Sequence, residues 1–353
     1  MIDSVKLNSI SQNYGEVQAL ININLEIKDG EFFSLLGPSG SGKTTCLRII
    51  AGFEPPNEGT VFLFNENVTT IPPYKRRVNT VFQDYALFPH MTVEHNVGYS
   101  LKIKGVSLEE YRKQVHEILH VVKLEGYTER KINQLSGGQK QLVAIARSLI
   151  TKPKLLMMDE PFANLDQRLK NKIRDITLHL LQKTFTTALI VTHDPDDAMF
   201  MGDFIAVMNK GKILQFDTPV NIYNKPNSAF VARFFGETLS LRSKVNNRKV
   251  KTIFGPIKVT DSKSIKAKEI EIIFRSEAFS ITKSNPKKIQ GKIKSKIIAV
   301  KYISENSYLH LDILNNSVQK HLHIKVPGKF IPPKNKICYI NIGKRNFFIF
   351  KYK

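Results

Sequence analysis

Apolar residues in the first two-thirds of the chain form short continuous runs separated by segments with a helical pattern. Residues 30–37, 154–161 and 186–194 each contain such a run. Continuous apolar runs between helices are typical of the strands of a parallel sheet that is covered on both faces. The first run is followed at 42–52 by a helical pattern. The sequence therefore predicts an α/β domain.

The segment from about residue 85 to residue 151 is mostly helical in pattern. It is predicted to be a helical subdomain inserted into the α/β domain. One predicted helix follows the residues Ser-Gly-Gly-Gln at 136–139, because apolar residues recur at helical spacing from Leu142 to Leu149. Two adjacent glycines are a poor start for a helix, unless an anion must approach the backbone there.

After Gly236 the pattern changes to short segments of alternating apolar and polar residues, separated by Asn, Gly, Pro and Lys. This pattern is typical of an all-β fold, here a small barrel or a pair of barrels. We therefore predict two domains, residues 1–236 and residues 237–353.

The net charge of +22 is concentrated in the second predicted domain. Residues 237–353 contain 26 Lys and Arg and 7 Asp and Glu, a balance of +19, which leaves +3 for residues 1–236. A basic domain suits nucleic acid or an anionic lipid surface. The lysines alternate with apolar residues and form no single block, which favours a solvated surface. We expect no nucleic-acid partner.

Cysteine content and hydropathy limit the cellular setting. The two cysteines, Cys46 and Cys338, form no metal-type cluster, so we expect a reducing compartment without disulfides. The first ten residues lack the apolar core of a signal peptide, and no stretch approaches the roughly 18 apolar residues of a membrane span. A membrane process would therefore need other chains to cross the membrane.

A glycine-rich segment after the first predicted strand fits the phosphate-loop pattern G-x-x-x-x-G-K-[ST] in its required setting, between a strand and a helix. Its glycines let backbone N–H groups surround phosphates, Lys43 is expected to reach the β- and γ-phosphates, and the Thr44 hydroxyl is expected to bind Mg²⁺. The predicted ATP-binding residues of this loop are Gly37, Pro38, Ser39, Gly40, Ser41, Gly42, Lys43, Thr44 and Thr45.

Two acidic residues end the second predicted strand. Asp159 lies at the carboxyl end of "LLMMDE", where ligands bind in open α/β sheets, and is expected to bind the Mg²⁺ of the nucleotide. Glu160 follows at once and is placed to accept a proton from a water molecule that attacks the γ-phosphate. The two acidic residues alone are weak evidence for a nucleotide-binding site. Together with the phosphate loop they are strong evidence for one.

Three further residues are weaker candidates. His193 ends another apolar run and suits either a structural hydrogen bond or a γ-phosphate contact. Gln83 follows a short apolar run before the helical insertion and is a candidate contact to Mg²⁺ or water. Tyr14 precedes the first core segment and is a candidate for stacking on adenine, although an ordinary surface role fits it as well.

Together these motifs resemble, in order and spacing, the nucleotide-binding subunit of an ABC transporter over residues 1–236. The motifs that carry the resemblance are Tyr14, "GPSGSGKTT" (37–45), Gln83, "LSGGQ" (135–139), "LLMMDEP" (155–161), "ANLD" (163–166) and His193. The resemblance implies a P-loop NTPase (RecA-like) ABC cassette with an inserted helical subdomain, and an OB-like (TOBE) barrel after it. It also implies ATP and Mg²⁺ as ligands, Glu160 as catalytic base, His193 as the γ-phosphate contact, and Gln83 as a contact to Mg²⁺ or water.

The resemblance also implies an assembly. In this family two cassettes dimerise head to tail, and each ATP lies between one phosphate loop and the signature of the other subunit. Here the signature side would comprise Leu135, Ser136, Gly137, Gly138, Gln139 and Asp166. The implied partners are a second copy, two transmembrane permease subunits and a substrate-binding protein. The implied location is peripheral, on the cytoplasmic face of the inner membrane.

Two positions depart from the family pattern. Leu142 stands where Arg is usual, and Asn164 replaces a commoner small residue. Neither is a phosphate ligand in the family, so ATPase activity is expected to survive both changes.

The substrate is less defined than the ATPase. The segments 31–40, 71–93 and 101–106 resemble ATPases of polyamine (spermidine/putrescine) importers, whereas 159–169, 191–208 and 230–237 equally resemble those of ferric-iron importers. Sugar importers are a weaker third possibility. A tail with Arg275 and Glu277 is similar to the tail barrel of such importers. A soluble ABC ATPase that acts on nucleic acid or ribosomes is the alternative of another class.

Overall fold

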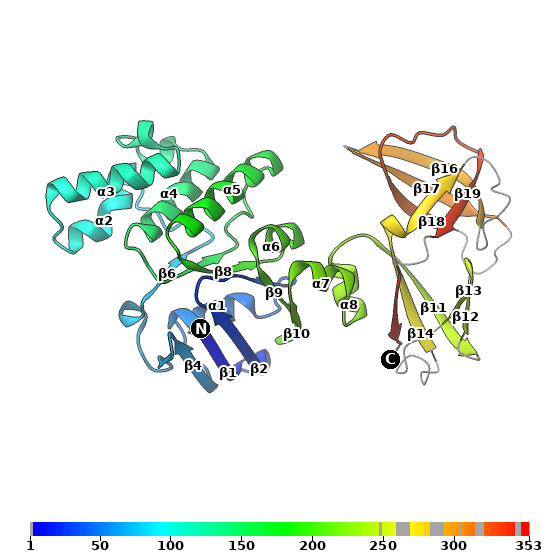
Figure 1. The fold of residues 1–353 in the computed structure, drawn as a ribbon, viewed down its shortest axis with the longest axis horizontal. Helices are drawn as coiled ribbons and strands as arrows, with labels where there is room; N and C mark the ends of the chain where they lie inside the picture. The colour runs from blue at the N-terminus through cyan, green and yellow to red at the C-terminus, as the bar shows by residue number, and fades with distance from the viewer. Residues whose placement is uncertain are drawn as a thin grey trace. The chain divides into compact units, whose positions relative to one another are not determined.

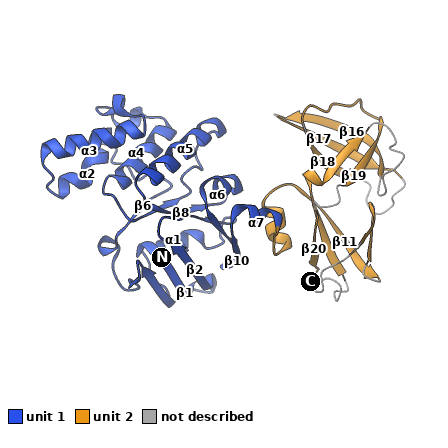
Figure 2. Cartoon of the chain, in the orientation of Figure 1, with its two compact units in different colours: residues 1–224 blue, residues 225–353 orange. Residues whose placement is uncertain are grey.

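The computed structural model describes residues 3–246, 249–258, 269–282, 293–303, 305–314, 321–342 and 347–352. The chain divides into two compact units, residues 1–224 and residues 225–353 (Figure 2). Across these described ranges, we find no helix with the length and apolar character needed to cross a membrane.

The first unit is built on a six-stranded sheet in the order β10-β9-β3-β8-β7-β6. Neighbouring strands from β9 to β6 are parallel, and β10 is antiparallel to β9. The strands are β3 (Phe32–Leu36), β6 (Val78–Val81), β7 (Leu155–Asp159), β8 (Thr187–Thr192), β9 (Phe204–Asn209) and β10 (Lys212–Asp217). The three strands predicted from apolar runs are therefore confirmed as β3, β7 and β8.

Both faces of this sheet are buried, as the continuous apolar runs predict. Successive side chains of a strand point to opposite faces. In β7, Leu156 and Met158 join a core with the helical subdomain. The alternate residues, Leu155 and Met157, join a second core on the other face.

A second, antiparallel sheet closes that other face. Its strand order is β2-β1-β4-β5, and its core also contains residues of the first helix, α1. The elements are β1 (Asp3–Tyr14), β2 (Val17–Lys28), β4 (Glu58–Leu63), β5 (Glu66–Asn67) and α1 (Lys43–Ala51). Helix α1 was predicted, whereas the pairing of β1 with β2 was not.

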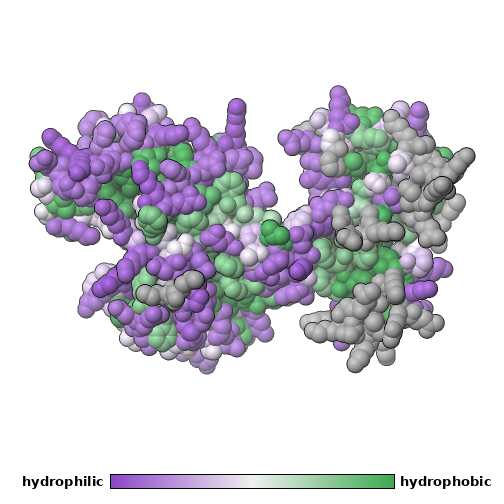
Figure 3. Space-filling view, in the orientation of Figure 1, coloured by the Kyte–Doolittle hydropathy of each residue, from purple (hydrophilic) through white to green (hydrophobic). Residues whose placement is uncertain are grey.

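Most of the remaining helices of the first unit lie on the other side of the central sheet (Figure 1). These helices are α2 (Val93–Ile103), α3 (Leu108–Val121), α4 (Gly137–Leu149), α5 (Gln167–Lys183), α6 (Pro195–Met201) and α7 (Pro219–Asn224). Hydrophilic residues predominate on the visible face of the helical subdomain (Figure 3), although Tyr99 and Ile103 of α2 and Leu108 of α3 are exposed. Leu142 and Leu149 are buried in the core beneath, as the periodicity of α4 predicts.

The second unit is β-rich, which confirms the predicted change of class. Its described strands form two five-stranded sheets, β13-β12-β11-β14-β20 and β15-β19-β16-β17-β18, in which all pairings are antiparallel. Residues of both sheets share one apolar core. The strands are β11 (Thr238–Asn246), β12 (Lys249–Thr252), β13 (Gly255–Lys258), β14 (Glu269–Arg275), β15 (Phe279–Thr282), β16 (Ile293–Ile303), β17 (Asn306–Ile313), β18 (His321–Pro327), β19 (Ile337–Ile342) and β20 (Phe347–Lys351).

A short helix, α8 (Ala229–Phe234), lies before the predicted boundary at residue 236. It packs on β14 and β20 of the second unit. The division into functional domains at 236 and 237 stays a prediction.

Candidate nucleotide-binding site

The phosphate loop connects β3 to α1, the strand–loop–helix setting that the motif requires. Gly40 and Gly42 have φ angles of 75° and 102°, in the left-handed region that favours glycine. Gly42 is also the N-cap of α1. A Cβ atom on Gly42 would lie 2.4 Å from the carbonyl oxygen of Ala19, so no other residue fits here without a shift of β2.

Lys43 is held inside the loop that precedes it. Its Nζ donates hydrogen bonds to the carbonyl oxygens of Gly37 at 2.8 Å and Pro38 at 3.0 Å. Burial lowers the pKa of the Lys43 ammonium group. Among the described residues, the buried Ser41 Oγ has no hydrogen-bond partner. A phosphate oxygen would satisfy both polar groups, which is the chemistry that the loop predicts.

Asp159 and Thr44 lie together, although 115 positions separate them in the sequence. The Thr44 hydroxyl donates a hydrogen bond of 3.3 Å to Asp159 Oδ1. Burial raises the pKa of the Asp159 carboxyl group, and the Thr44 hydrogen bond opposes that rise. A hydroxyl and a carboxylate oxygen are ligands of the kind that Mg²⁺ prefers.

Glu160 and His193 also meet at this edge of the sheet. Glu160 Oε2 accepts a hydrogen bond of 2.8 Å from His193 Nδ1. The backbone of Glu160 is left-handed, with φ 48°, and its N–H donates to the carbonyl oxygen of Val191 at 2.8 Å. A left-handed non-glycine residue costs free energy, and such residues gather at functional sites.

A buried ion-pair network next to His193 was not anticipated from the sequence. Lys170 and Arg174 of α5 pair with Asp197, and Lys170 also pairs with Asp194. Arg174 Nε donates to Asp197 Oδ1 at 2.6 Å, and Thr192 donates to Asp197 Oδ2 at 3.3 Å. The network ties α5 to the residues on either side of His193. Basic residues four positions apart on a helix can indicate such a network, but the same spacing fits an exposed helix face equally well.

Tyr14 lies next to the end of the phosphate loop, and Gln83 follows strand β6. The Tyr14 side chain is 46% exposed, its hydroxyl donates to Glu54, and it also interacts with Thr45 at the end of the phosphate loop. Burial is the main cause that raises the pKa of the Tyr14 hydroxyl. Gln83 is exposed and follows Val81, which pairs with Met158 in the central sheet. Gln83 follows a short strand before the helical insertion, as predicted, whereas Tyr14 ends β1, which already carries the core residues Val5, Leu7 and Ile10, and so does not precede the first core segment. The roles of both residues stay predictions.

The signature begins helix α4. Ser136 Oγ accepts from the Gln139 N–H at 3.4 Å, and Gln139 Oε1 accepts from the Ser136 N–H at 2.9 Å. This reciprocal capping box fixes the start of the helix. The two glycines between them have different surroundings. A Cβ on Gly138 would lie 2.6 Å from Ile173 of α5, whereas a Cβ on Gly137 meets nothing closer than 3.9 Å.

The structure therefore gives Gly138 a packing role within the chain and leaves room for an approaching group only at Gly137. Leu135 is buried beside the signature. Asp166 is the N-cap of α5 and accepts from the Leu169 N–H at 3.0 Å. Of the two unusual residues, Leu142 is buried in the core, and Asn164 interacts with Tyr85.

Comparisons with known proteins agree with this geometry. A family profile described as "ABC transporter" matches residues 20–163. The "Spermidine/putrescine import ATP-binding protein PotA" of Clostridioides difficile (strain 630) is 42% identical over 316 residues, which cover 89% of this chain and 91% of the relative.

Solved structures are similar to the first two-thirds of the chain. The ATP-binding cassette MJ0796, in a dimeric post-hydrolysis state bound to ADP and Pi, is 37% identical and has a TM-score of 0.55. The match covers 61% of this chain and 98% of that one. The protein cbiO1 of Clostridium perfringens, part of the ABC transporter complex cbiONQ, is 29% identical with a TM-score of 0.58, over 63% of this chain and 91% of that one.

The chain belongs to the ABC transporter family. It is an ATP-hydrolysing, nucleotide-binding subunit of that family. Proteins of this kind act as dimers with membrane permease components.

We expect Arg174→Met to destabilise the first unit, because Asp197 would keep a buried charge with one partner fewer. Removing one partner of a buried pair costs about 3 kcal/mol in the free energy of unfolding. Urea unfolding of the full chain, followed by far-ultraviolet circular dichroism of the helices, measures this change. The matched control is Lys172→Met on the exposed face of α5, with an expected change below about 0.5 kcal/mol. Equal stability of the two variants would show that the network does not stabilise α5.

Proposed function

We propose that this chain is the ATPase subunit of a polyamine importer, with spermidine and putrescine as the transported class. The observation that carries this proposal is the convergence of the phosphate loop, the Thr44–Asp159 pair and the Glu160–His193 pair at one edge of the sheet. The substrate class rests on the similarity to the spermidine/putrescine import subunit over most of both chains. The same similarity favours polyamines over the ferric-iron alternative.

In the proposed mechanism, the backbone N–H groups of the loop 37–45, of which Pro38 has none, and the Lys43 ammonium group bind the phosphates of ATP. The carboxylate of Glu160 accepts a proton from the water that attacks the γ-phosphorus, and ADP and phosphate leave as products. The His193 hydrogen bond orients Glu160 in the structure, and His193 can also contact the γ-phosphate. Gln83 borders the attacking water, and Tyr14 stacks on adenine.

The oxygen atoms of Thr44 and Asp159 fit Mg²⁺, with Gln83 as a further ligand. A bound Mg²⁺ would supply positive charge against the β- and γ-phosphates. Burial is the main cause that raises the pKa of the Asp159 carboxyl group. A nearby cation favours the ionised carboxylate, so Asp159 is suited to bind one.

The proposed site is completed by a second copy of the chain. The residues Leu135, Ser136, Gly137, Gly138, Gln139 and Asp166 would face the γ-phosphate bound by the partner. The open space at Gly137 and the N-terminus of α4 suit an anion there. Hydrolysis removes the charge that bridges the two copies, so the dimer opens.

The proposed assembly contains two copies of this chain, two permease subunits that cross the membrane, and a binding protein that delivers the substrate. The chain itself would lie on the cytoplasmic face of the inner membrane as a peripheral subunit. The helical subdomain would transmit opening and closing of the dimer to the permeases.

We expect Glu160→Gln to bind ATP with unchanged affinity and to hydrolyse it at least about 100-fold more slowly, because the amide cannot accept the proton of the attacking water. The variant should accumulate as an ATP-bound dimer, visible by size-exclusion chromatography. Steady-state phosphate release measures the rate. The control Glu66→Gln, at an exposed position of β5, should match the unmodified protein. Unimpaired turnover in Glu160→Gln would remove Glu160 as the base.

We expect Ser136→Asp to prevent ATP-driven dimerisation while leaving ATP binding by the monomer intact. Asp caps a helix as well as Ser, so the start of α4 is kept, but its charge repels the γ-phosphate of the partner. Ser136→Asn is the matched control, because it caps equally and carries no charge. Both are made in the Glu160→Gln background and followed by light scattering. Loss of nucleotide binding in the Ser136→Asp monomer would contradict the placement across the dimer.

The substrate class is tested by uptake of labelled putrescine, spermidine and ferric iron in cells that lack this gene. Polyamine uptake should be lost and iron uptake retained. The unmodified gene should restore uptake, and the Glu160→Gln gene should not. Loss of iron uptake with intact polyamine uptake would overturn the substrate class and leave the ATPase proposal standing.

A further inference from the structure

Three metal-ligating side chains meet on the second unit, whereas the phosphate loop belongs to the first unit. His310, Asp312 and His321 each offer one ligand atom, and these atoms lie within 4.8 Å of one another. His310 and Asp312 belong to β17, and His321 belongs to β18. None of the motifs of the ATPase includes them.

The strand register places these residues on one face. Asp312 pairs with His321, and His310 pairs with His323, in neighbouring antiparallel positions. Side chains directly opposite each other on one face of an antiparallel pair are close enough to share a ligand. The alternate residues Leu309 and Leu311 point into the apolar core, which fixes the face that the polar residues occupy.

Two buried polar atoms of the cluster, His310 Nε2 and Asp312 Oδ1, have no hydrogen bond within the described residues. His321 Nδ1 lies 2.5 Å from Asp312 Oδ1, a contact that does not meet hydrogen-bond geometry. Leaving a buried polar atom unsatisfied costs free energy, and a bound cation would satisfy both atoms at once.

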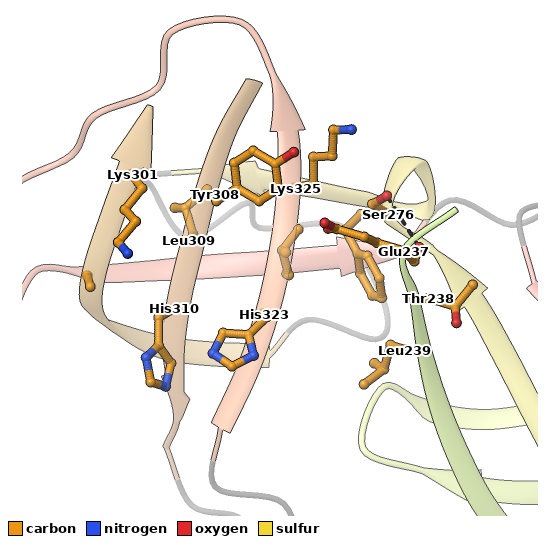
Figure 4. A pocket seen from close by; sticks show the side chains of 13 residues that line it. Glu237, Thr238, Leu239, Ser276, Lys301, Tyr308, Leu309, His310, His323 and Lys325 are labelled. Atoms are coloured by element: carbon orange, nitrogen blue, oxygen red, sulfur yellow. Dashed lines mark hydrogen bonds between the residues drawn. The ribbon is translucent and has the colours of Figure 1, made fainter. Parts of the chain in front are cut away.

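One residue of the cluster, His310, lines a cavity of the second unit. The cavity has a volume of about 650 Å³ and is lined by His310 and His323, which lie side by side on neighbouring strands (Figure 4). Their ring centroids are 4.4 Å apart. The neighbour of His310 on β16 is Ala299, whose small side chain also lines the cavity. An ion bound at His310 therefore has room for a water ligand on this side.

We propose that His310, Asp312 and His321 form a binding site for one divalent transition-metal ion of the Zn²⁺ class. Two imidazoles and a carboxylate suit Zn²⁺, whereas Mg²⁺ and Ca²⁺ prefer oxygen ligands alone. Three protein ligands leave a fourth tetrahedral position for water. Lys296 of β16 lies opposite Asp312, and its positive charge opposes cation binding. The affinity should therefore be lower than that of a closed site with four protein ligands.

The test is isothermal titration calorimetry of the full chain with Zn²⁺, after removal of any affinity tag and of bound metal. Mg²⁺ is present in excess and nucleotide is left out, so that the ATP site does not contribute to the measured Zn²⁺ binding. We expect one equivalent of Zn²⁺ to bind. His321→Ala should weaken binding at least about tenfold, and His310→Ala should do the same. His321 is exposed, so its replacement leaves the core intact.

The matched control is His120→Ala on α3. His120 also forms an exposed pair with a carboxylate, 3.1 Å from Glu125, but it belongs to no group of three ligands in the described chain. Zn²⁺ binding should be unchanged in this variant, and X-ray absorption of the unmodified protein should show imidazole and oxygen ligands. Equal Zn²⁺ binding by His321→Ala, His310→Ala and the unmodified protein would overturn the proposal, as would no binding by the unmodified protein.

Discussion

The parallel pairing of β6, β7, β8 and β3 is the constraint on which the candidate site depends. Parallel strands end at the same edge of a sheet, so residues that follow them must lie near one another. The register pairs Leu36 with Thr192 and Asp159 with Val191. The phosphate loop, Glu160 and His193 follow directly from these paired positions. A one-residue slip would turn every side chain of a strand to the opposite face and separate the groups.

In the proposed function this site is half of a larger one, because the signature is not part of the edge that the parallel strands form. The signature begins α4, which belongs to the helical subdomain, whereas the phosphate loop belongs to the edge of the sheet. The contacts of Gly138 are with α5, and those of Lys43 are with its own loop. Each chain would then supply one phosphate-facing helix start to its own nucleotide and another to the nucleotide of its partner.

Sequence reasoning predicted the features that depend on local pattern. Lys43, Thr44, Asp159 and Glu160 occupy their predicted places because a strand, a loop and a helix follow one another in the chain. The features that depend on long-range pairing were not predicted. The antiparallel pairing of β1 with β2 carries no motif, and the Arg174–Asp197 pair joins positions whose charges suit an exposed helix equally well. The role of Gly138 also needed the structure, because Ile173 becomes its neighbour only on folding.

The dependence of ATPase activity on protein concentration tests the shared site most directly. Steady-state turnover per chain would be measured from well above to well below the concentration at which dimers form, with mass photometry reporting the oligomeric state. If each site needs a second copy, turnover per chain falls as dimers dissociate. Turnover that stays constant in a solution of monomers would contradict the account.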